Sequence, residues 1–402
     1  MRVGSASLWP FAALSASYFA HAGFFNTFLP LWLNELGLGL LTIGILTSLP
    51  AATRLFAPYL WAWLSDHSGH RIGLLRYCAL GAFVASIALW LEWGVVGLSV
   101  CLLLMLTHTS GMMPLSETVL AQRVSLSGQF DARRYGRVRV WGSMGFLVTV
   151  LAAGAWFDRD GIGSFPVWTS VTLLLVVVCV WLVPAVREPR HTHIVPVSMA
   201  SVLANPSLRW FFGSLFLHVL SHLFVYIFFS LYLHELGYSK STIGMLWAFG
   251  VLVEMVWFVS QGRWLPKLSL GNWLILAGAV MVVRMFATAA FADSLWVLFV
   301  AQALHAVTFA VHHSVCIHII SERFPGPTQA RGQALYAVVG YGLSGVTAGF
   351  IGGWVSSIWG LHTVYWLALV AALMATAAAT VSARISAPAP PAPSGSHPPQ
   401  TR

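Results

Sequence analysis

Twelve long apolar stretches, separated by short polar or Gly/Pro breaks, dominate this chain. Each has roughly the 20 residues that a helix needs to cross the hydrocarbon core of a bilayer. Backbone groups in lipid must be hydrogen-bonded within the protein, so we expect helices. The alternating pattern of a β-barrel is missing. The predicted spans are residues 9–33, 41–64, 72–91, 95–122, 134–157, 165–186, 209–233, 241–264, 271–291, 295–321, 330–356 and 360–384.

Composition places the chain in the membrane rather than in water. Of 402 residues, 58% are hydrophobic and 8% charged, whereas a soluble domain carries about 25% charged residues. This excludes a water-soluble globular protein and a disordered chain. The net charge is +9, but the basic residues are thinly spread between apolar runs, so we expect the lipid bilayer, and no nucleic acid, as a partner.

The distribution of Lys and Arg predicts the orientation. If the N-terminus is cytoplasmic, sixteen basic residues fall on the cytoplasmic side, and only Arg159 and Lys240 fall outside. We therefore predict a multi-pass protein of the cell inner membrane with both termini in the cytoplasm. The sequence Ala20-His21-Ala22 could imitate a signal-peptide cleavage site, but the apolar run continues to residue 33, which favours a retained helix.

An internal repeat divides the chain into two halves. LWLNELG at 31–37 recurs as LYLHELG at 231–237, and nine of the sixteen positions 31–46 match those 200 residues further on. In each half the match joins the first helix to the second. We therefore predict an all-α membrane protein of twelve transmembrane helices in two six-helix halves, which is the major facilitator fold. The predicted parts are an N-terminal half (1–186), a cytoplasmic linker (187–208), a C-terminal half (209–385) and a disordered Pro-rich tail (386–402).

Five charged residues stand out inside the predicted spans: Arg54, Glu117, Arg139, Glu254 and Arg284. Each costs at least about 2.5–3.5 kcal/mol in hydrocarbon and normally faces partners or water. They either line a central cavity between the halves or form fixed ion pairs between helices. Together they carry a charge of +1, which favours an anionic substrate, since Arg holds a carboxylate through two hydrogen bonds.

Histidine is unusually plentiful within the spans. Such residues can carry protons through a cavity or hydrogen-bond between helices. Neither their spacing nor the four cysteines, all within spans, match a metal box, so we predict no metal and no cofactor. The histidines are His21, His108, His218, His222, His305, His312, His313 and His318.

Four stretches resemble one branch of the major facilitator superfamily, the proton-coupled oligosaccharide and phenylpropionate permeases. They are PLSE at 114–117, YGRVRVWGS at 135–143, LAGAVMVVR at 276–284 and QALHAVTF at 302–309. The resemblance implies that a Glu and an Arg of the N-terminal half hold the substrate, while C-terminal residues couple it to protons. With the charges above, it predicts substrate binding by Glu117, Arg139 and Arg54, and proton coupling by Glu254, Arg284 and His305.

Two departures bear on the substrate. Sugar-transporting members of the branch carry a Glu where this chain has Thr308 and a Lys where it has Gln302. The resemblance therefore implies an organic acid, such as an aromatic carboxylate, rather than a disaccharide. It also implies that Glu254 pairs with Arg139 across the two halves.

The segment 62–71 is a degraded form of the superfamily's GxxxDRxGRR gating motif. Asp66, Gly69 and Arg71 remain, while Ala62, His67 and His70 depart from it. We predict a gating loop here; a loop that merely tethers two helices is the alternative.

The expected function is proton symport of a small organic anion by alternating access, with the protein acting as a monomer. The alternatives are a proton-coupled sugar or nucleoside permease of the same fold and a transporter-like receptor. An enzyme is not expected, because the sequence shows no nucleophile–base motif.

Overall fold

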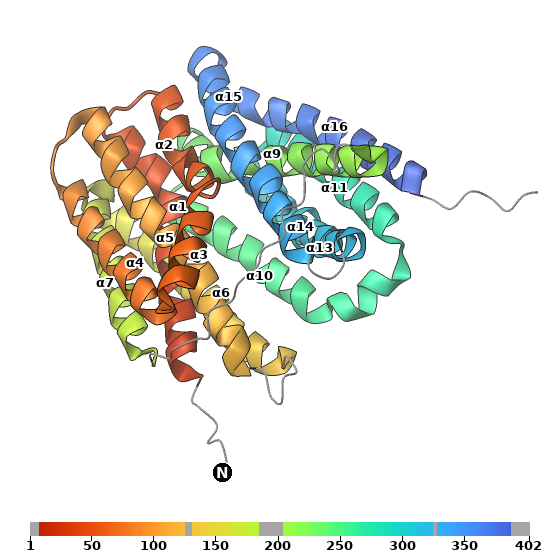
Figure 1. The fold of residues 1–402 in the computed structure, drawn as a ribbon. Helices are drawn as coiled ribbons and strands as arrows, with labels where there is room; N and C mark the ends of the chain where they lie inside the picture. Colours follow the sequence, from red (N-terminus) through yellow and green to blue (C-terminus); the bar gives the residue numbers. More distant parts are fainter. Residues whose placement is uncertain (1–7, 125–130, 185–203, 325–327, 387–402) are drawn as a thin grey trace, which may run out of the picture.

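The computed structural model describes residues 8–124, 131–184, 204–324 and 328–386, and all regular structure within these ranges is helical (Figure 1). Most of the predicted linker (187–208) and nearly all of the predicted tail (386–402) lie outside the described residues. Helices occupy all twelve predicted spans, as the fold prediction requires.

The N-terminal half departs from the expectation at its second span, which is two helices rather than one. The chain leaves helical geometry at Arg54–Phe56, between Pro50 and Pro58. Proline lacks the N–H that would continue the ladder, so a break near such residues is expected. The helices are α1 (Trp9–Glu35), α2 (Leu40–Thr53), α3 (Ala57–Ser68), α4 (Arg71–Ile87), α5 (Gly94–Val124), α6 (Ala132–Asp160) and α7 (Phe165–Leu182).

The C-terminal half contains two π-helical segments, Ala306–Val311 between α12 and α13, and Tyr336–Leu343 between α14 and α15. A π-turn rotates the side chains beyond it relative to a regular α-helix and often lies at functional sites. The helices are α9 (Pro206–Glu235), α10 (Lys240–Trp264), α11 (Leu270–Phe291), α12 (Leu295–Ala303), α13 (His312–Arg323), α14 (Gln329–Leu335), α15 (Ser344–Trp359) and α16 (His362–Ser386).

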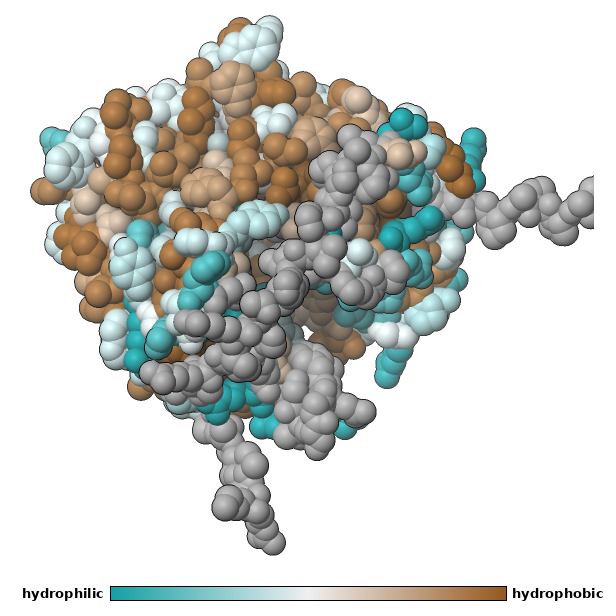
Figure 2. Space-filling model, in the orientation of Figure 1, coloured by the Kyte–Doolittle hydropathy of each residue, from teal (hydrophilic) through white to brown (hydrophobic). Residues whose placement is uncertain are grey.

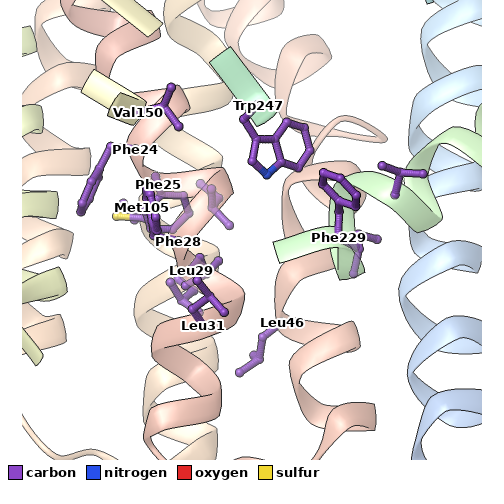
Figure 3. Packing of buried hydrophobic residues seen from close by; sticks show 14 of the residues in the cluster. Phe24, Phe25, Phe28, Leu29, Leu31, Leu46, Met105, Val150, Phe229 and Trp247 are labelled. Atoms are coloured by element: carbon purple, nitrogen blue, oxygen red, sulfur yellow. The ribbon is translucent and has the colours of Figure 1, made fainter. Parts of the chain in front are cut away.

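Eleven helical segments among the described residues are long and apolar enough to cross a membrane, and α1 is not among them. α1 is 27 residues long, but its sequence is interrupted by polar residues. Seventeen of its residues are buried, because α6, α7 and α9 pack around it. Phe24, Phe25 and Phe28 carry this packing (Figure 3). α1 is therefore an inner helix, covered by protein rather than by lipid.

The surface agrees with a membrane location. Figure 2 shows hydrophobic side chains over most of the visible face, and hydrophilic ones mainly along its lower and right-hand edges. Exposed large side chains include Trp296 at 81% and Val259 at 88%. An apolar surface of this extent has to face lipid.

The two halves meet at one end of the molecule, where α2 packs on α15 and α6 on α10. Gly44 lies against the backbone of Gly349, and the repeat-related Gly244 lies against the backbone of Val150. A Cβ at either glycine would collide with those carbonyl oxygens, so glycine permits the close approach. Toward the other end the halves diverge (Figure 1).

A carboxylate adds to the same contact. Asp158, near the end of α6, accepts hydrogen bonds from the backbone N–H groups of Lys240 (2.7 Å) and Ser241 (2.8 Å). These are orphan donors in the first turn of α10. One half of the molecule thus caps a helix of the other half at this closed end.

Candidate functional site

A cavity of about 320 Å³ lies between the two halves. Its wall comes from α1, the α2–α3 break and α6 on one side, and from α9, α10, α11 and the α12–α13 region on the other. Five of the six residues predicted from sequence to bind substrate or couple protons line it, namely Arg54, Arg139, Glu254, Arg284 and His305. The sixth, Glu117, reaches the site through Arg139.

The charges of the N-terminal half are loosely held. Arg139 Nε lies 3.9 Å from Glu117 Oε1, and the two side chains are 43% and 28% exposed. A pair this long and this open contributes little to stability. The Arg139 guanidinium also lies 4.3 Å from the centre of the Phe19 ring. Its favourable contacts are thus weak ones that a bound anion can replace.

Arg54 lies at the break between α2 and α3. Its guanidinium is 5.6 Å from the centre of the Tyr341 ring, which belongs to the other half. Among the described residues no carboxylate pairs with it. Among the described residues, the cavity therefore holds two guanidinium groups that form no ion pair shorter than 3.9 Å.

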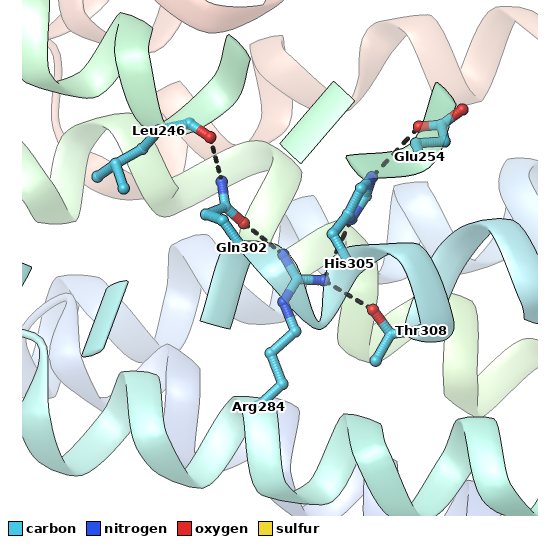
Figure 4. Close-up of polar contacts among 6 residues, drawn as sticks. All are labelled: Leu246, Glu254, Arg284, Gln302, His305 and Thr308. Carbon is cyan, nitrogen blue, oxygen red and sulfur yellow. Dashed lines mark hydrogen bonds and ion pairs between the residues drawn. The ribbon is translucent and has the colours of Figure 1, made fainter. Parts of the chain in front are cut away.

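The charge of the C-terminal half, in contrast, is fixed. Arg284 is 3% exposed; it donates to Gln302 Oε1 at 2.7 Å and to Thr308 Oγ1 at 3.0 Å. Gln302 in turn donates to the carbonyl of Leu246 at 3.1 Å (Figure 4). The π-helical segment brings Thr308 to the same guanidinium as His305, three residues earlier in the chain.

His305 connects this arginine to Glu254. Arg284 Nη1 lies 3.3 Å from His305 Nδ1, and His305 Nε2 lies 3.4 Å from Glu254 Oε2 (Figure 4). Because Arg only donates, Nδ1 is the acceptor, and in the neutral ring the proton is on Nε2, facing the carboxylate. The three residues form a continuous chain that ends at the cavity.

The expected Glu254–Arg139 pair is not formed within the described structure. Each residue has a nearer partner in its own half, His305 for Glu254 and Glu117 for Arg139. The two side chains line opposite walls of one cavity, so an ion pair between them would need the walls to close.

Aromatic rings make up much of the C-terminal wall. Phe309 and His305 are parallel, with ring centres 5.2 Å apart, and Tyr226 lies 5.3 Å from Trp247. The sequence could not separate Phe309, Tyr226 and Trp247 from the other aromatic residues. Among these three, only Phe309 lies in a stretch that the sequence analysis singled out, QALHAVTF at 302–309.

The histidines noted within the predicted spans make different contacts. His218 is buried, and its Nε2 lies 2.7 Å from the carbonyl of Thr308, so it supports the π-helical segment. Its ring stacks on His312 at 3.7 Å. His21 pairs with Thr172 Oγ1 at 2.9 Å. His222, one turn from His218, is the one that faces the cavity together with His305.

The predicted gating loop joins α3 to α4. Gly69 ends α3 in the left-handed conformation, with φ of +65°, which favours glycine. Arg71 Nε donates to Ser65 Oγ at 3.0 Å, across the turn. The side chain of Asp66 lies outside what the structure describes, so its predicted role stays a prediction.

Known proteins resemble this chain over most of its length. The sequence matches the MFS_1 like family over residues 8–367. It is 28% identical over 365 residues to the "Probable 3-phenylpropionic acid transporter" of Escherichia coli (strain K12), across 89% of this chain and 93% of that one. The "Maltose permease" of Geobacillus stearothermophilus is 26% identical over 332 residues, across 80% and 81% of the two chains.

Solved structures agree on the fold. The crystal structure of the nucleoside transporter NupG aligns with a TM-score of 0.81, across 94% of this chain and 98% of that one, at 13% identity. That identity shows a shared fold and nothing finer. With the family match spanning nearly the whole chain, the protein belongs to the MFS_1 like family and is a multi-pass membrane transporter of the major facilitator superfamily.

Proposed function

We propose that this protein is a proton symporter for a small organic anion, an aromatic carboxylate of the phenylpropionate kind, and works by alternating access. One observation carries the proposal. Two loosely held guanidinium groups, Arg54 and Arg139, face a wall of aromatic rings and a carboxylate–histidine pair across a single cavity. The relative named as a 3-phenylpropionic acid transporter supports the same substrate class.

Substrate binding follows from the N-terminal charges. The carboxylate takes the hydrogen-bond donors of Arg139 and Arg54, displacing the weak contact with Glu117. The apolar body of the substrate then lies against Phe309 and Tyr226 in the opposite wall. The cavity, at about 320 Å³, is of the size that holds a small molecule.

Charge balance supplies the coupling. The ionisable residues at the site, two Glu and three Arg, sum to +1 when His305 is neutral. Protonation of Glu254 raises this to +2, and the bound anion restores +1. Anion and proton therefore bind favourably together, because their opposite charges attract each other in a low-dielectric site and each lowers the cost of binding the other. His305 holds Glu254 in place, and Arg284 in turn holds His305.

Alternating access requires that one end be closed while the other is open. In the orientation proposed from the basic residues, an inner-membrane protein with both termini in the cytoplasm, the end closed by Gly44, Gly244 and Asp158 faces outward. The structure then corresponds to the inward-open state. Loss of the contacts at Gly44, Gly244 and Asp158 opens the cavity to the outside. We propose that a monomer suffices, since the cavity is built within one chain.

A sugar or nucleoside permease is the alternative, favoured by the relative named maltose permease. A neutral solute would leave Arg54 and Arg139 without an anionic partner. Competition against a labelled acid by maltose, uridine or 3-phenylpropionate separates these classes directly.

The test is uptake of labelled 3-phenylpropionate into vesicles that contain the protein, with an inward-directed proton gradient. We expect concentrative uptake that a protonophore abolishes and that Arg139→Gln reduces at least tenfold. Arg137→Gln is the matched control, because Arg137 is an exposed residue on the same helix and lies outside the cavity wall. No uptake above empty vesicles, or equal losses in both variants, would contradict the proposal.

A further inference from the structure

One histidine in the cavity wall has no hydrogen-bond partner among the described residues. His222 is 3% exposed, and no hydrogen bond to either of its ring nitrogens is found among the described residues. Its Nδ1 is completely buried. Two other buried histidines, His21 and His218, each place a ring nitrogen within hydrogen-bonding distance of a protein oxygen. A buried polar group without a hydrogen-bond partner is uncommon, so the position of His222 in the cavity wall requires an explanation.

The tautomer of His222 follows from its burial. A neutral imidazole carries one N–H and one lone pair. A buried N–H without an acceptor is rarer in proteins than an unsatisfied acceptor, so the sealed Nδ1 holds the lone pair. The proton is then on Nε2, the nitrogen that a molecule in the cavity meets. His222 thus offers the cavity a hydrogen-bond donor.

Aromatic rings surround this donor. The ring of His222 lies 5.1 Å from that of His305, 5.5 Å from Phe309 and 4.8 Å from Tyr226, and the first two are within 28° of parallel. The surroundings suit the flat face of an aromatic ring. At the repeat-related position the N-terminal half has Ala22, which also lines the cavity. This histidine donor therefore belongs to the C-terminal wall alone, opposite Arg54 and Arg139.

We propose that His222 determines specificity by donating a hydrogen bond from Nε2 to a hydroxyl oxygen on the aromatic ring of the substrate. The preferred substrates are then ring-hydroxylated arylpropionates rather than unsubstituted ones. This rests on the proposed function, because the carboxylate must be held by Arg139 and Arg54 for the ring to reach the C-terminal wall.

The experiment is competition binding to the purified full chain in nanodiscs, with labelled 3-phenylpropionate displaced by itself and by its 2-, 3- and 4-hydroxy derivatives. We expect one hydroxy isomer to bind about five- to tenfold more tightly than the parent acid, the gain of a single neutral hydrogen bond. His222→Phe should remove that preference and leave the parent acid within about twofold of its native affinity. His222→Gln, which retains a donor, should retain part of the preference.

The controls separate the possible failures. Tyr226→Phe removes a second polar group of the same cluster, keeps the ring and should keep the preference. Preference for the parent acid in the native chain, or a preference that survives in His222→Phe or disappears in Tyr226→Phe, overturns the role of His222 while leaving the proposed function intact. If none of the acids binds in an Arg139-dependent way, the proposed function fails, and this inference fails with it.

Discussion

Arg54 and Glu254 occupy equivalent positions in the two repeats, and their surroundings differ sharply. Arg54 lies where a helix breaks and contacts an aromatic ring of the other half. Glu254 lies on the unbroken α10 and is 3.4 Å from His305, which in turn contacts Arg284. Repeat-related positions thus carry a loosely held charge, Arg54, in the N-terminal half and a charge within a polar network, Glu254, in the C-terminal half. We infer that the N-terminal half adapts to substrate, while the C-terminal half keeps a preorganised proton site.

The local cause can be found in the repeat itself. Position 58 is Pro in the first half and its equivalent, position 258, is Phe. A proline removes the backbone hydrogen bond to the residue four positions earlier, here Arg54, and pushes away the preceding turn. Phe258 instead lets α10 continue to Trp264. This difference between the repeats accompanies the different surroundings of the two charges.

The largest effect is expected at Glu254. Glu254→Gln should abolish concentrative uptake and leave exchange of substrate across the membrane largely intact, since the amide mimics the protonated carboxyl. Arg54→Gln should instead weaken the binding of substrate, while the remaining uptake stays sensitive to the proton gradient. Parallel uptake and counterflow assays measure both. If Glu254→Gln also loses exchange, Glu254 binds substrate and the division between the halves is wrong.

A smaller effect, on thermal stability, is expected when Arg284 or Arg54 is replaced by lysine. One ammonium cannot replace the planar fork that reaches Gln302 and Thr308, so Arg284→Lys should cost about 1–2 kcal/mol and lower the Tm by a few degrees. Arg54→Lys should leave the Tm nearly unchanged, because Arg54 has no such network. Thermal unfolding in detergent compares the two. Equal shifts would remove the contrast between a loose and a fixed charge.

The smallest effect is expected at the closed end. Asp158 caps α10 from the other half, and no corresponding cap can come from its repeat equivalent, Ile358. Loss of a helix cap costs about 1 kcal/mol, so Asp158→Ala should increase opening of this end about fivefold.

Thiol labelling measures that opening. A cysteine at the cavity residue Val251, in a chain lacking its four native cysteines, should react faster with an impermeant reagent added to the closed side. Asp160→Ala is the control, because Asp160 pairs with its neighbour Arg159 rather than with α10. Unchanged labelling in Asp158→Ala would show that the glycine contacts alone keep this end shut.

The sequence predicts the helices and the repeat well, because apolar length and the matched ELG and TIG triplets are strong local signals. It also brings five charged or titratable residues to one cavity correctly. It does not predict the break at Arg54, although Pro50 and Pro58 signal it, or the π-helical segments, which depend on tertiary contacts. The predicted pair of Glu254 with Arg139 is not formed in the described structure. The two residues lie on opposite walls of the cavity, so whether they meet depends on which state the transporter occupies.

The burial of α1 has a consequence for how the protein is assembled. α1 is synthesised before α6, α7 and α9, yet these are the helices that cover it. Until α7 is in place, His21 lacks Thr172, and the polar side chains of α1 would face hydrocarbon. α1 therefore reaches its final position only after helices made later have entered the bilayer. The first of the described helices to leave the ribosome is thus not the first to reach its final packing.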